Sequence, residues 1–293
     1  MTKEFEMTDI GEMSYFLGVE VKQMKYGTFV SQKKCAEQIL RKFNMKDCKP
    51  VAMPAELGMK LSVDSSREPV NSTLFKSIIG ILRHLTIMRP DIIYAVGIVN
   101  RYMEKPKQDH LIAAKRILRY IKGTMDQGLF YTHSQSSKLV GYSDSDYGGD
   151  LDDRKSTSGY FFHIGFAAFS WSSKKQQTVA LSTCEAEDMA VATCTCQAIW
   201  LKNILGELSI IKGPITIYVD NKSTISLAKN PVSHCRSKHI DTKYHFIQEQ
   251  VKNKNVELVY CRTEDELADI FTKPLKADIF DKLKEKPGMK SSV

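Results

Sequence analysis

Two carboxylates stand where short apolar stretches of the sequence end. Asp144 follows residues 139–143, and Asp220 follows Ile215–Val219. A carboxylate inside a sheet is costly unless it is paired or bound to a metal, so both acids suit the end of a strand. If the two strands are parallel neighbours, their carboxyl ends lie together, at the edge where open α/β sheets place their sites. Taken alone, the stretch around Asp144 fits an ordinary acidic turn before Gly148 better than it fits a metal site.

Two further acids come from predicted helices. Ser182 and Glu185 have the spacing of a capping box, which gives Glu185 a structural role at a helix start. Glu187, two positions on, is turned by roughly 200° from Glu185 and needs another explanation. Asp269 lies on the flank of a short helix whose apolar residues would face the sheet.

Together these acids form a ligand set for hard divalent cations, which prefer oxygen ligands and keep several waters. The candidate metal ligands and catalytic residues are Asp144, Glu187, Asp220 and Asp269. Two such ions about 4 Å apart would clamp an in-line phosphodiester displacement. The alternative is four unrelated surface acids, in a chain that has 34.

A sheet with helices on it must bring these acids together. The sequence predicts strands at residues 139–145, 159–164, 167–172, 215–219 and 256–260, the first three consecutive and antiparallel. Helices are predicted at residues 183–208, 222–229, 238–252 and 265–272. Three strands followed by alternating helices and strands indicate an α/β domain with a mixed five-stranded sheet and flanking helices.

The first half of the chain predicts a smaller α+β lobe. Its pattern contains a hairpin at residues 15–21 and 28–31, a proline-containing loop at 49–69, and helices at about 32–44, 72–88, 90–103 and 108–122. The residues after Lys276 are rich in lysine and are predicted to be a flexible basic tail.

Composition limits the class of protein. The excess of 42 Lys+Arg over 34 Asp+Glu gives a net charge of +8, which suits a polyanionic partner or a solvated basic surface. The seven cysteines are scattered and odd in number, which indicates a reducing compartment. No apolar run approaches the ~20 residues of a membrane span. The charged N-terminus lacks the apolar core of a secretory signal, so we expect an intracellular protein that is not secreted.

Five cations are candidates for contact with nucleic acid. They are Lys115, Arg119, Lys122, Lys174 and Lys175. The first three form a stripe on the predicted helix 108–122, which either follows a phosphate backbone or is a solvated face. The last two precede the helix that carries Glu187, where cations would offset the repulsion between an acidic site and phosphate.

Several long blocks of sequence carry a family resemblance. In the second half they are GYSDSDYGGDLDDRKSTSGYFF, SWSSKKQQTVALSTCEAE, YVDNKSTISLAKNP, SKHIDTKYHFIQEQV and ELADIFTKPL. These blocks resemble the ribonuclease H domain of Ty1/copia-type retrotransposon Pol polyproteins. Upstream, residues 11–54 resemble the last part of the reverse transcriptase of such a polyprotein. Residues 75–103 and 113–124 resemble the segment that joins the two.

The resemblance implies a fold, an activity and a cofactor. Ribonuclease H enzymes have a five-stranded mixed sheet with flanking helices, and cleave RNA within an RNA–DNA hybrid with Mg²⁺ and an Asp-Glu-Asp-Asp set. Asp144, Glu187, Asp220 and Asp269 match that set in order, with two Mg²⁺ ions expected and Mn²⁺ as a substitute. Asp188 departs from the family, where an aromatic residue usually follows the Glu. The loop at residues 260–264 also lacks the His of cellular ribonucleases H.

The resemblance also implies a division of the chain. Residues 1–62 would be the end of the reverse transcriptase, 63–132 a helical connection or thumb-like segment, 138–275 the ribonuclease H-like domain, and 276–293 the tail. The Tyr-x-Asp-Asp strand of the polymerase would precede Phe5 and is missing, so we expect no polymerase activity from this chain. The expected partners are an RNA–DNA hybrid and the remaining Pol portion, in a cytoplasmic retroelement particle or in the nucleus.

Three function classes stay open. The first is an active hybrid-specific nuclease, which the presence of all four acids favours. The second is a catalytically idle remnant of an element, which the missing polymerase motif favours. The third is a nucleic-acid-binding or effector-type module. Residues 116–119 spell the R-x-L-R tetrad of oomycete secreted effectors. They lie inside a predicted amphipathic helix without a signal peptide, so we interpret this match as coincidence.

Overall fold

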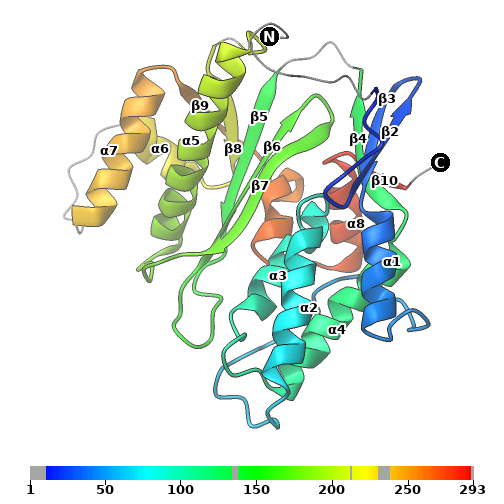
Figure 1. Cartoon of the computed structure of the whole chain (residues 1–293). Coiled ribbons are helices and arrows are strands. Elements are labelled where there is room, and N and C mark those ends of the chain that lie inside the picture. The colour runs from blue at the N-terminus through cyan, green and yellow to red at the C-terminus, as the bar shows by residue number, and fades with distance from the viewer. Residues whose placement is uncertain (1–10, 134–137, 212, 230–237, 292–293) are drawn as a thin grey trace, which may run out of the picture.

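The computed structural model describes residues 11–133, 138–211, 213–229 and 238–291, the side chains of residues 238–241 excepted (Figure 1). Residues 1–10, at the start of the predicted lobe, and residues 134–137, between the two predicted halves, lie outside that description. The described residues form two sheets of five strands each.

The sheet of the second half has the predicted strands. They are β5 (Leu139–Ser145), β6 (Thr157–Ile164), β7 (Ala167–Lys175), β8 (Ile215–Val219) and β9 (Val256–Tyr260), in the spatial order β7-β6-β5-β8-β9. β5, β6 and β7 are antiparallel, whereas β5, β8 and β9 are parallel. The chain therefore has the predicted α/β fold with a ribonuclease H-like mixed sheet. β5 and β8 are parallel neighbours, as their terminal acids required.

One face of this sheet is covered by helices from its own half of the chain. α5 (Thr183–Glu207) lies along β5 and β6, with α6 (Lys222–Lys229) and α7 (Lys238–Lys252) beside it (Figure 1). Ile217 and Leu258 from the strands pack with Val191 and Leu201 of α5 in a core that belongs to this half alone.

The other face is covered in a different way. A short 3₁₀ helix, η3 (Leu267–Phe271), and α3 (Ile93–Asn100) of the first half lie against it. Phe161 of β6 and Phe271 of η3 stack with ring centroids 5.8 Å apart, inside a core that continues into the helices of the first half. Gly159 allows this close approach, because a Cβ there would lie 2.7 Å from the Thr272 side chain.

The first half forms the predicted α+β lobe. Its sheet contains β1 (Tyr15–Phe16), β2 (Val19–Met24), β3 (Gly27–Ser31) and β4 (Gln127–Thr132), and its helices are α1 (Lys33–Lys42), α2 (Ser72–Leu85), η1 (Pro90–Ile92), α3 and α4 (Gln108–Gly123). Residues 15–21 are not one strand. They turn at Leu17 and Gly18, whose φ angles of 48° and 84° let β1 fold back on β2.

The predicted flexible tail after Lys276 is wrong. Residues 277–285 form α8 (Ala277–Glu285), and Met289–Ser291 form β10, which pairs antiparallel with β4 of the lobe. Phe280 and Leu283 of α8 are buried, as is Met289. The prediction relied on the high lysine content and overlooked these three apolar residues, which pack in the shared core.

Two helix predictions differ in detail. The helix predicted at residues 265–272 is two 3₁₀ turns, η2 (Thr263–Asp265) and η3, because the extended backbone of Glu266, with a ψ angle of 104°, separates them. The helix predicted at residues 90–103 begins as η1 at Pro90 and ends at Asn100. Within the described chain, none of the helices has both the length and the hydropathy of a membrane span.

Candidate active site

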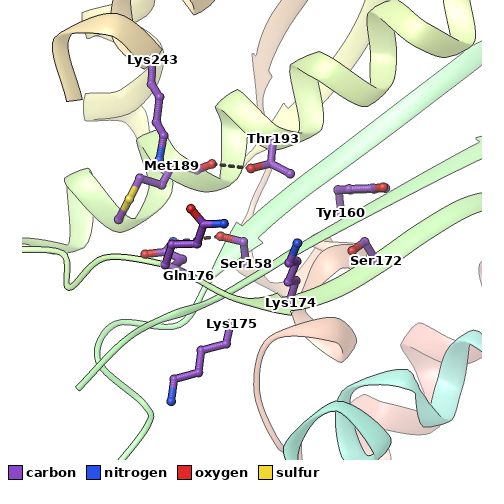
Figure 2. Close-up of a pocket in the computed structure, with 10 residues that line it drawn as sticks. Ser158, Tyr160, Ser172, Lys174, Lys175, Gln176, Met189, Thr193 and Lys243 are labelled. Carbon is purple, nitrogen blue, oxygen red and sulfur yellow. Dashed lines mark hydrogen bonds between the residues drawn. The ribbon is translucent and has the colours of Figure 1, made fainter. Parts of the chain in front are cut away.

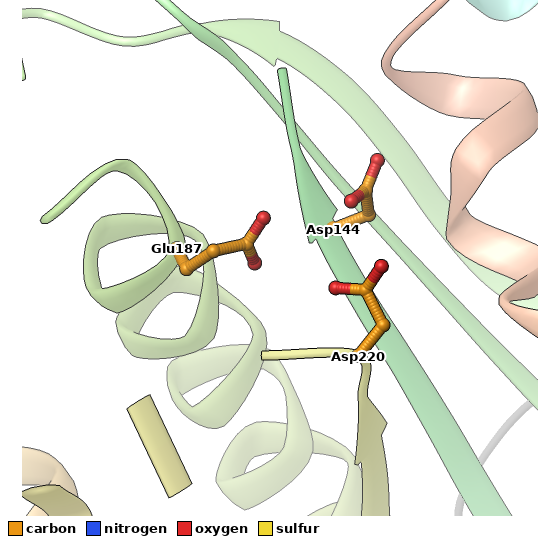
Figure 3. A group of neighbouring side chains, drawn as sticks. All are labelled: Asp144, Glu187 and Asp220. Atoms are coloured by element: carbon orange, nitrogen blue, oxygen red, sulfur yellow. The ribbon is translucent and has the colours of Figure 1, made fainter. Parts of the chain in front are cut away.

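Three of the four predicted acids meet at the carboxyl ends of β5 and β8. Asp144 is the penultimate residue of β5, Asp220 follows β8, and Glu187 lies in the second turn of α5 (Figure 3). Each offers a carboxylate oxygen, and these oxygens lie within 4.8 Å of one another. Asp144 and Glu187 are buried, and Asp220 is partly exposed at the rim. The cluster thus has one side open to a ligand.

Each carboxylate in this cluster accepts a hydrogen bond that orients it. Thr272 Oγ1 donates to Asp144 Oδ2, and Thr263 Oγ1 donates to Asp220 Oδ2 over 3.0 Å. The backbone N–H of Ser145 donates to Glu187 Oε1 over 3.1 Å. Both threonines come from the segment around η2 and η3, so that segment sets the orientation of two of the three acids.

Asp269, the fourth predicted acid, stands outside this group of three and is joined to it by a lysine. Lys273 Nζ lies 2.7 Å from Asp269 Oδ1 and 3.7 Å from Asp144 Oδ2. Asp269 is 4% exposed and sits in η3, opposite the end of β5. The ammonium group therefore forms ion pairs with two of the predicted metal ligands.

Burial and mutual repulsion raise the pKa values of three of these acids. Burial, followed by the charges of Asp144 and Asp220, raises the pKa of Glu187 well above its usual value. Burial and then the charge of Asp144 raise the pKa of Asp220. Burial and then Asp144 raise the pKa of Asp269 to about 7, against the opposing effect of Lys273. A cation beside these groups would favour their ionised forms.

A divalent metal fits the oxygens that the cluster leaves free. The Oε2 atom of Glu187 is buried and has no hydrogen-bond partner among the described residues. A buried acceptor without a donor costs free energy, and a metal ion at this position would remove that cost. The three carboxylates offer oxygen ligands alone, which is the donor set of hard divalent cations. The acidic cluster is compatible with divalent metal binding.

The start of α5 separates a capping acid from the cluster acid. Ser182 Oγ accepts from the Glu185 N–H over 3.1 Å, and Glu185 Oε2 accepts from the Leu181 N–H over 2.9 Å. Glu185 therefore caps the helix, while Glu187 points toward β5. Asp188, the departure from the family pattern, is 4% exposed.

Sequence reasoning missed several residues that hold the cluster. Lys273 had a signal, because it follows Asp269 at the i,i+4 spacing of a helical ion pair. Glu266 is fully buried and accepts from the Ala268 N–H and from Cys261 Sγ, at 2.9 and 2.8 Å. It caps η3, the element that carries Asp269. Its role depends on burial, which the sequence pattern did not show.

The two lysines predicted before α5 have different surroundings. Lys175 forms ion pairs with Asp150 and Asp153, at 2.7 and 2.8 Å. Asp150 also accepts from Arg101 Nη1 of the lobe over 2.8 Å. Lys174 is exposed and has no ion pair to a described residue. The structure therefore leaves Lys174 as the lysine of this pair whose charge is available to a ligand.

The stripe on α4 is partly occupied by internal contacts. Arg119 Nε donates to the backbone oxygen of Lys49 over 2.7 Å, whereas Lys115 is exposed and Lys122 partly exposed. Within the same helix, Ile117 and Leu118 are buried. The R-x-L-R tetrad at residues 116–119 is thus part of a packed helix. α4 packs on α1, α2 and α3. Because α3 also contacts β7, it lies between α4 and the sheet that carries the acidic cluster.

Comparison with known proteins gives one matching family model and close relatives. Residues 1–57 match the family described as "Reverse transcriptase (RNA-dependent DNA polymerase)". The chain is 39% identical over 290 residues to the "Retrovirus-related Pol polyprotein from transposon RE2" of Arabidopsis thaliana, which covers 99% of the chain and 20% of that protein. The chain thus spans about a fifth of the length of that relative.

A shorter relative and a solved structure are also similar. The chain is 44% identical over 128 residues to the "Secreted RxLR effector protein 161" of Plasmopara viticola, covering 43% of the chain and 90% of that protein. A structure of the foamy viral protease-reverse transcriptase in complex with RNA/DNA hybrid superposes with a TM-score of 0.48 and 13% identity. It covers 89% of the chain and 30% of that protein.

Proposed function

We propose, from the premise that this chain belongs to the Pol polyproteins of copia-type retrotransposons, that it hydrolyses the RNA strand of RNA–DNA hybrids. The observation that carries this proposal is that carboxylate oxygens of Asp144 and Asp220, at the ends of parallel strands, and of Glu187, on α5, lie within 4.8 Å of one another. Carboxylate clusters that can hold divalent metal ions suit phosphodiester hydrolysis, in which charge develops on the attacking and leaving oxygens. The chain acts as the nuclease portion of a larger Pol protein.

Each residue of the site has a proposed role in this reaction. Asp144, Glu187 and Asp220 would hold Mg²⁺, and Asp144 with Asp269 would hold a second ion, with Mn²⁺ as a substitute. Bound there, the two ions would activate water and stabilise the leaving oxygen. Thr272 and Thr263 hold the Asp144 and Asp220 carboxylates in place for the metal. Lys273 offsets part of the negative charge of Asp269 and Asp144.

The substrate and partners follow from the same premise. The substrate is an RNA–DNA hybrid, touched by Lys174 and by the stripe of Lys115, Arg119 and Lys122. Lys175 would contribute through the Asp150 loop that it fixes, and not through a free charge. The partner is the rest of the Pol protein, which would bring the polymerase motif. We place the activity inside the cell, in a cytoplasmic particle or the nucleus.

The test is cleavage of a hybrid with labelled RNA by the purified chain in the presence of Mg²⁺. We expect RNA cleavage in the hybrid, none in single-stranded RNA or DNA duplex, and none with chelator. Asp144→Asn should lower the rate by more than ~100-fold, since even residues behind a metal ligand often contribute 10–100-fold. Leu181→Ala, an exposed residue beyond the cap of α5, is the matched control.

Equal rates for wild type and Asp144→Asn would reject the proposal. A folded wild-type chain that binds hybrid but leaves it intact would favour the idle remnant. A chain that neither binds nor cuts hybrid would favour an effector-type module, which the similarity to the Plasmopara viticola protein brings into consideration.

A further inference from the structure

Arg101, directly after α3, joins the lobe to the turn that follows the acidic end of β5. Its Nη1 group donates to Asp150 Oδ2 over 2.8 Å, and its Nη2 group donates to Thr157 Oγ1 over 3.0 Å. Asp150 lies in the loop between β5 and β6, and Thr157 is the first residue of β6. One guanidinium group thus bridges two points of that turn.

Thr157 connects Arg101 to the end of β5. The backbone N–H of Thr157 donates to Asp146 Oδ1, and the Asp146 N–H donates to the backbone oxygen of Thr157 over 3.1 Å. Thr157 is 1% exposed, so water does not readily replace these partners. The two hydrogen bonds extend the β5–β6 ladder beyond Asp144, whose partner in β6 is Gly159. A shift of Thr157 would therefore shift the end of β5.

Two of the three clustered acids depend on the position of this strand end. Asp144 is part of it, and the Ser145 N–H donates the 3.1 Å hydrogen bond that orients Glu187 Oε1. A displaced strand end would move the first carboxylate directly and would take the donor away from the second. The hydrogen bonds of Arg101 reach both acids through Thr157 and β5.

A second contact holds the same β5–β6 loop against the lobe. Ser62 Oγ donates to Asp152 Oδ1 over 2.5 Å. Ser62 follows Leu61, whose backbone oxygen accepts from the hydroxyl of the buried Tyr102 over 2.9 Å. Tyr102 is the residue after Arg101, so both contacts start from one place in the lobe. The lobe therefore fixes the loop at two points.

The second half of the chain also supplies a cation to this loop, which separates two roles of Arg101. Lys175 Nζ lies 2.7 Å from Asp150 Oδ2, and Figure 2 shows its side chain pointing away from Lys174 and Gln176. Lys175 thus offsets the charge of Asp150 even without Arg101. The bridge to Thr157 is different, because it needs donors on two nitrogens at a fixed angle, which a lysine ammonium does not have.

We propose that Arg101 is a positioning residue of the candidate active site. Through Thr157 it holds the end of β5, and with it the Asp144 carboxylate and the donor to Glu187, in the geometry that binds Mg²⁺. This proposal rests on the proposed function for the identity of the metal and the reaction. It gives the lobe a role at the metal site through one side chain, in addition to the packing that covers the sheet.

The experiment compares Arg101→Lys, Thr157→Val and the double variant. Arg101→Lys keeps a charge beside Asp150 but loses the bridge, and Thr157→Val removes the accepting hydroxyl and keeps the branched shape. We expect each single variant to raise the dissociation constant of Mg²⁺, measured by calorimetric titration, about tenfold, as for other residues behind a metal ligand. The double variant should bind no more weakly than either single variant, because both remove one hydrogen bond.

Two further measurements separate positioning from general support. In hybrid cleavage at subsaturating Mg²⁺, kcat should fall while the KM for hybrid stays unchanged, since the bridge lies behind the metal ligands. Without metal or substrate, the Ser145 N–H should exchange with deuterium faster in Arg101→Lys than in the wild type, measured by NMR. Equal exchange rates would overturn the proposal.

The matched control is Arg83→Lys, at an exposed arginine in the last turn of α2, which should leave Mg²⁺ affinity and Ser145 exchange unchanged. A lower Tm of Arg101→Lys with the Mg²⁺ affinity of the wild type would mean that Arg101 only supports packing, and the proposal would fail. Additive losses in the double variant would also overturn it. If Arg101→Lys lacks the circular dichroism of the wild type, Thr157→Val alone is compared, with the same result expected.

The outcomes separate this role from the proposed activity. Weaker Mg²⁺ binding in both single variants, without cleavage by the wild-type chain, would reject the hydrolysis but retain the positioning. Cleavage by the wild type, with unchanged Mg²⁺ affinity in both variants, would reject the positioning alone. A wild-type chain that binds no Mg²⁺ would reject both.

Discussion

The two faces of the ribonuclease H-like sheet are covered by very different elements. On one face, the 25-residue helix α5 and its neighbour α7 form a core with residues of their own half of the chain. On the other, the five-residue η3 covers little, and helices of the lobe complete a core that includes Phe161 and Ala168. The first face is self-sufficient, whereas the second depends on the lobe.

The acids divide between these faces. Glu187 comes from the self-sufficient face, while Asp269, Lys273 and the orienting Thr272 come from η3 on the dependent face. The lobe therefore supports half of the candidate site without contributing a ligand to it. Two hydrogen bonds join the second half of the chain to the lobe. Trp171 Nε1 donates to the backbone oxygen of Thr86 over 3.1 Å, and Arg101 donates to Asp150.

The largest effect is expected when the lobe is removed. A chain of residues 138–291 would expose the Phe161 and Phe271 side chains, each worth about 1.5–3 kcal/mol of burial, together with their neighbours. We expect it to lose cooperative thermal unfolding and to bind a hydrophobic dye. Differential scanning calorimetry of both this chain and the chain of residues 11–291 compares their thermal unfolding and checks this prediction. A sharp, reversible transition in the shorter chain would show that both faces are self-sufficient.

A matched pair of core substitutions compares the faces directly. Phe271→Ala on the dependent face should destabilise by about 3–5 kcal/mol, and Leu258→Ala on the other by about 2–5 kcal/mol. Both residues are at most 1% exposed. Phe271 lies between Asp269 and Thr272, so its loss should also weaken Mg²⁺ binding, measured by calorimetric titration. Equal metal affinity in the two variants would separate the site from the packing of η3.

The pH dependence of stability should be dominated by the acids of the site. The pKa of Asp269 is about 7 in the folded chain, above its ordinary value of 3.8. The folded state therefore binds more protons than the unfolded state between these values, and its stability falls as the pH rises through that window. Without metal, we expect a higher Tm at pH 5.5 than at pH 8.

Saturating Mg²⁺ should raise the Tm more at pH 8 than at pH 5.5, because the metal binds the ionised carboxylates. Asp269→Asn, which removes the titrating group, should flatten the dependence without metal. A Tm that rises with pH in the metal-free protein would contradict the excess of negative charge at the site.

The smallest effect tests whether the lobe does more than cover the sheet. Lys115→Ala/Lys122→Ala removes two charges of the α4 stripe and spares Arg119, which bonds the Lys49 oxygen. If both contact phosphate, the salt slope of hybrid binding should flatten by roughly two units. Mg²⁺ dependence should not change. An unaltered slope would show that this stripe is a solvated face. The lobe would then only cover the sheet and would not contact the hybrid through α4.

Much of the fold could be predicted because its strands are short apolar runs that end in polar turns. Asp144 and Asp220 follow such runs, so their meeting required only that β5 and β8 be parallel neighbours. Glu187 was identified because Glu185 already had a capping role. By contrast, α8 and η3 owe their form to burial against residues that are distant in sequence. Local pattern carries no record of such contacts.

The pairing of β10 with β4 has a consequence for how the chain is made. β4 pairs with β3 on one side, where Leu129 lies opposite Val30, but its other side can pair with β10 only after Met289 has left the ribosome. Until then β4 is an edge with unpaired backbone groups, which can associate with other chains. The sheet of the lobe can therefore be completed only after the whole ribonuclease H-like half has been translated. A nascent chain stalled before Met289 should be digested by protease within β4, and a chain released after Ser291 should be protected there.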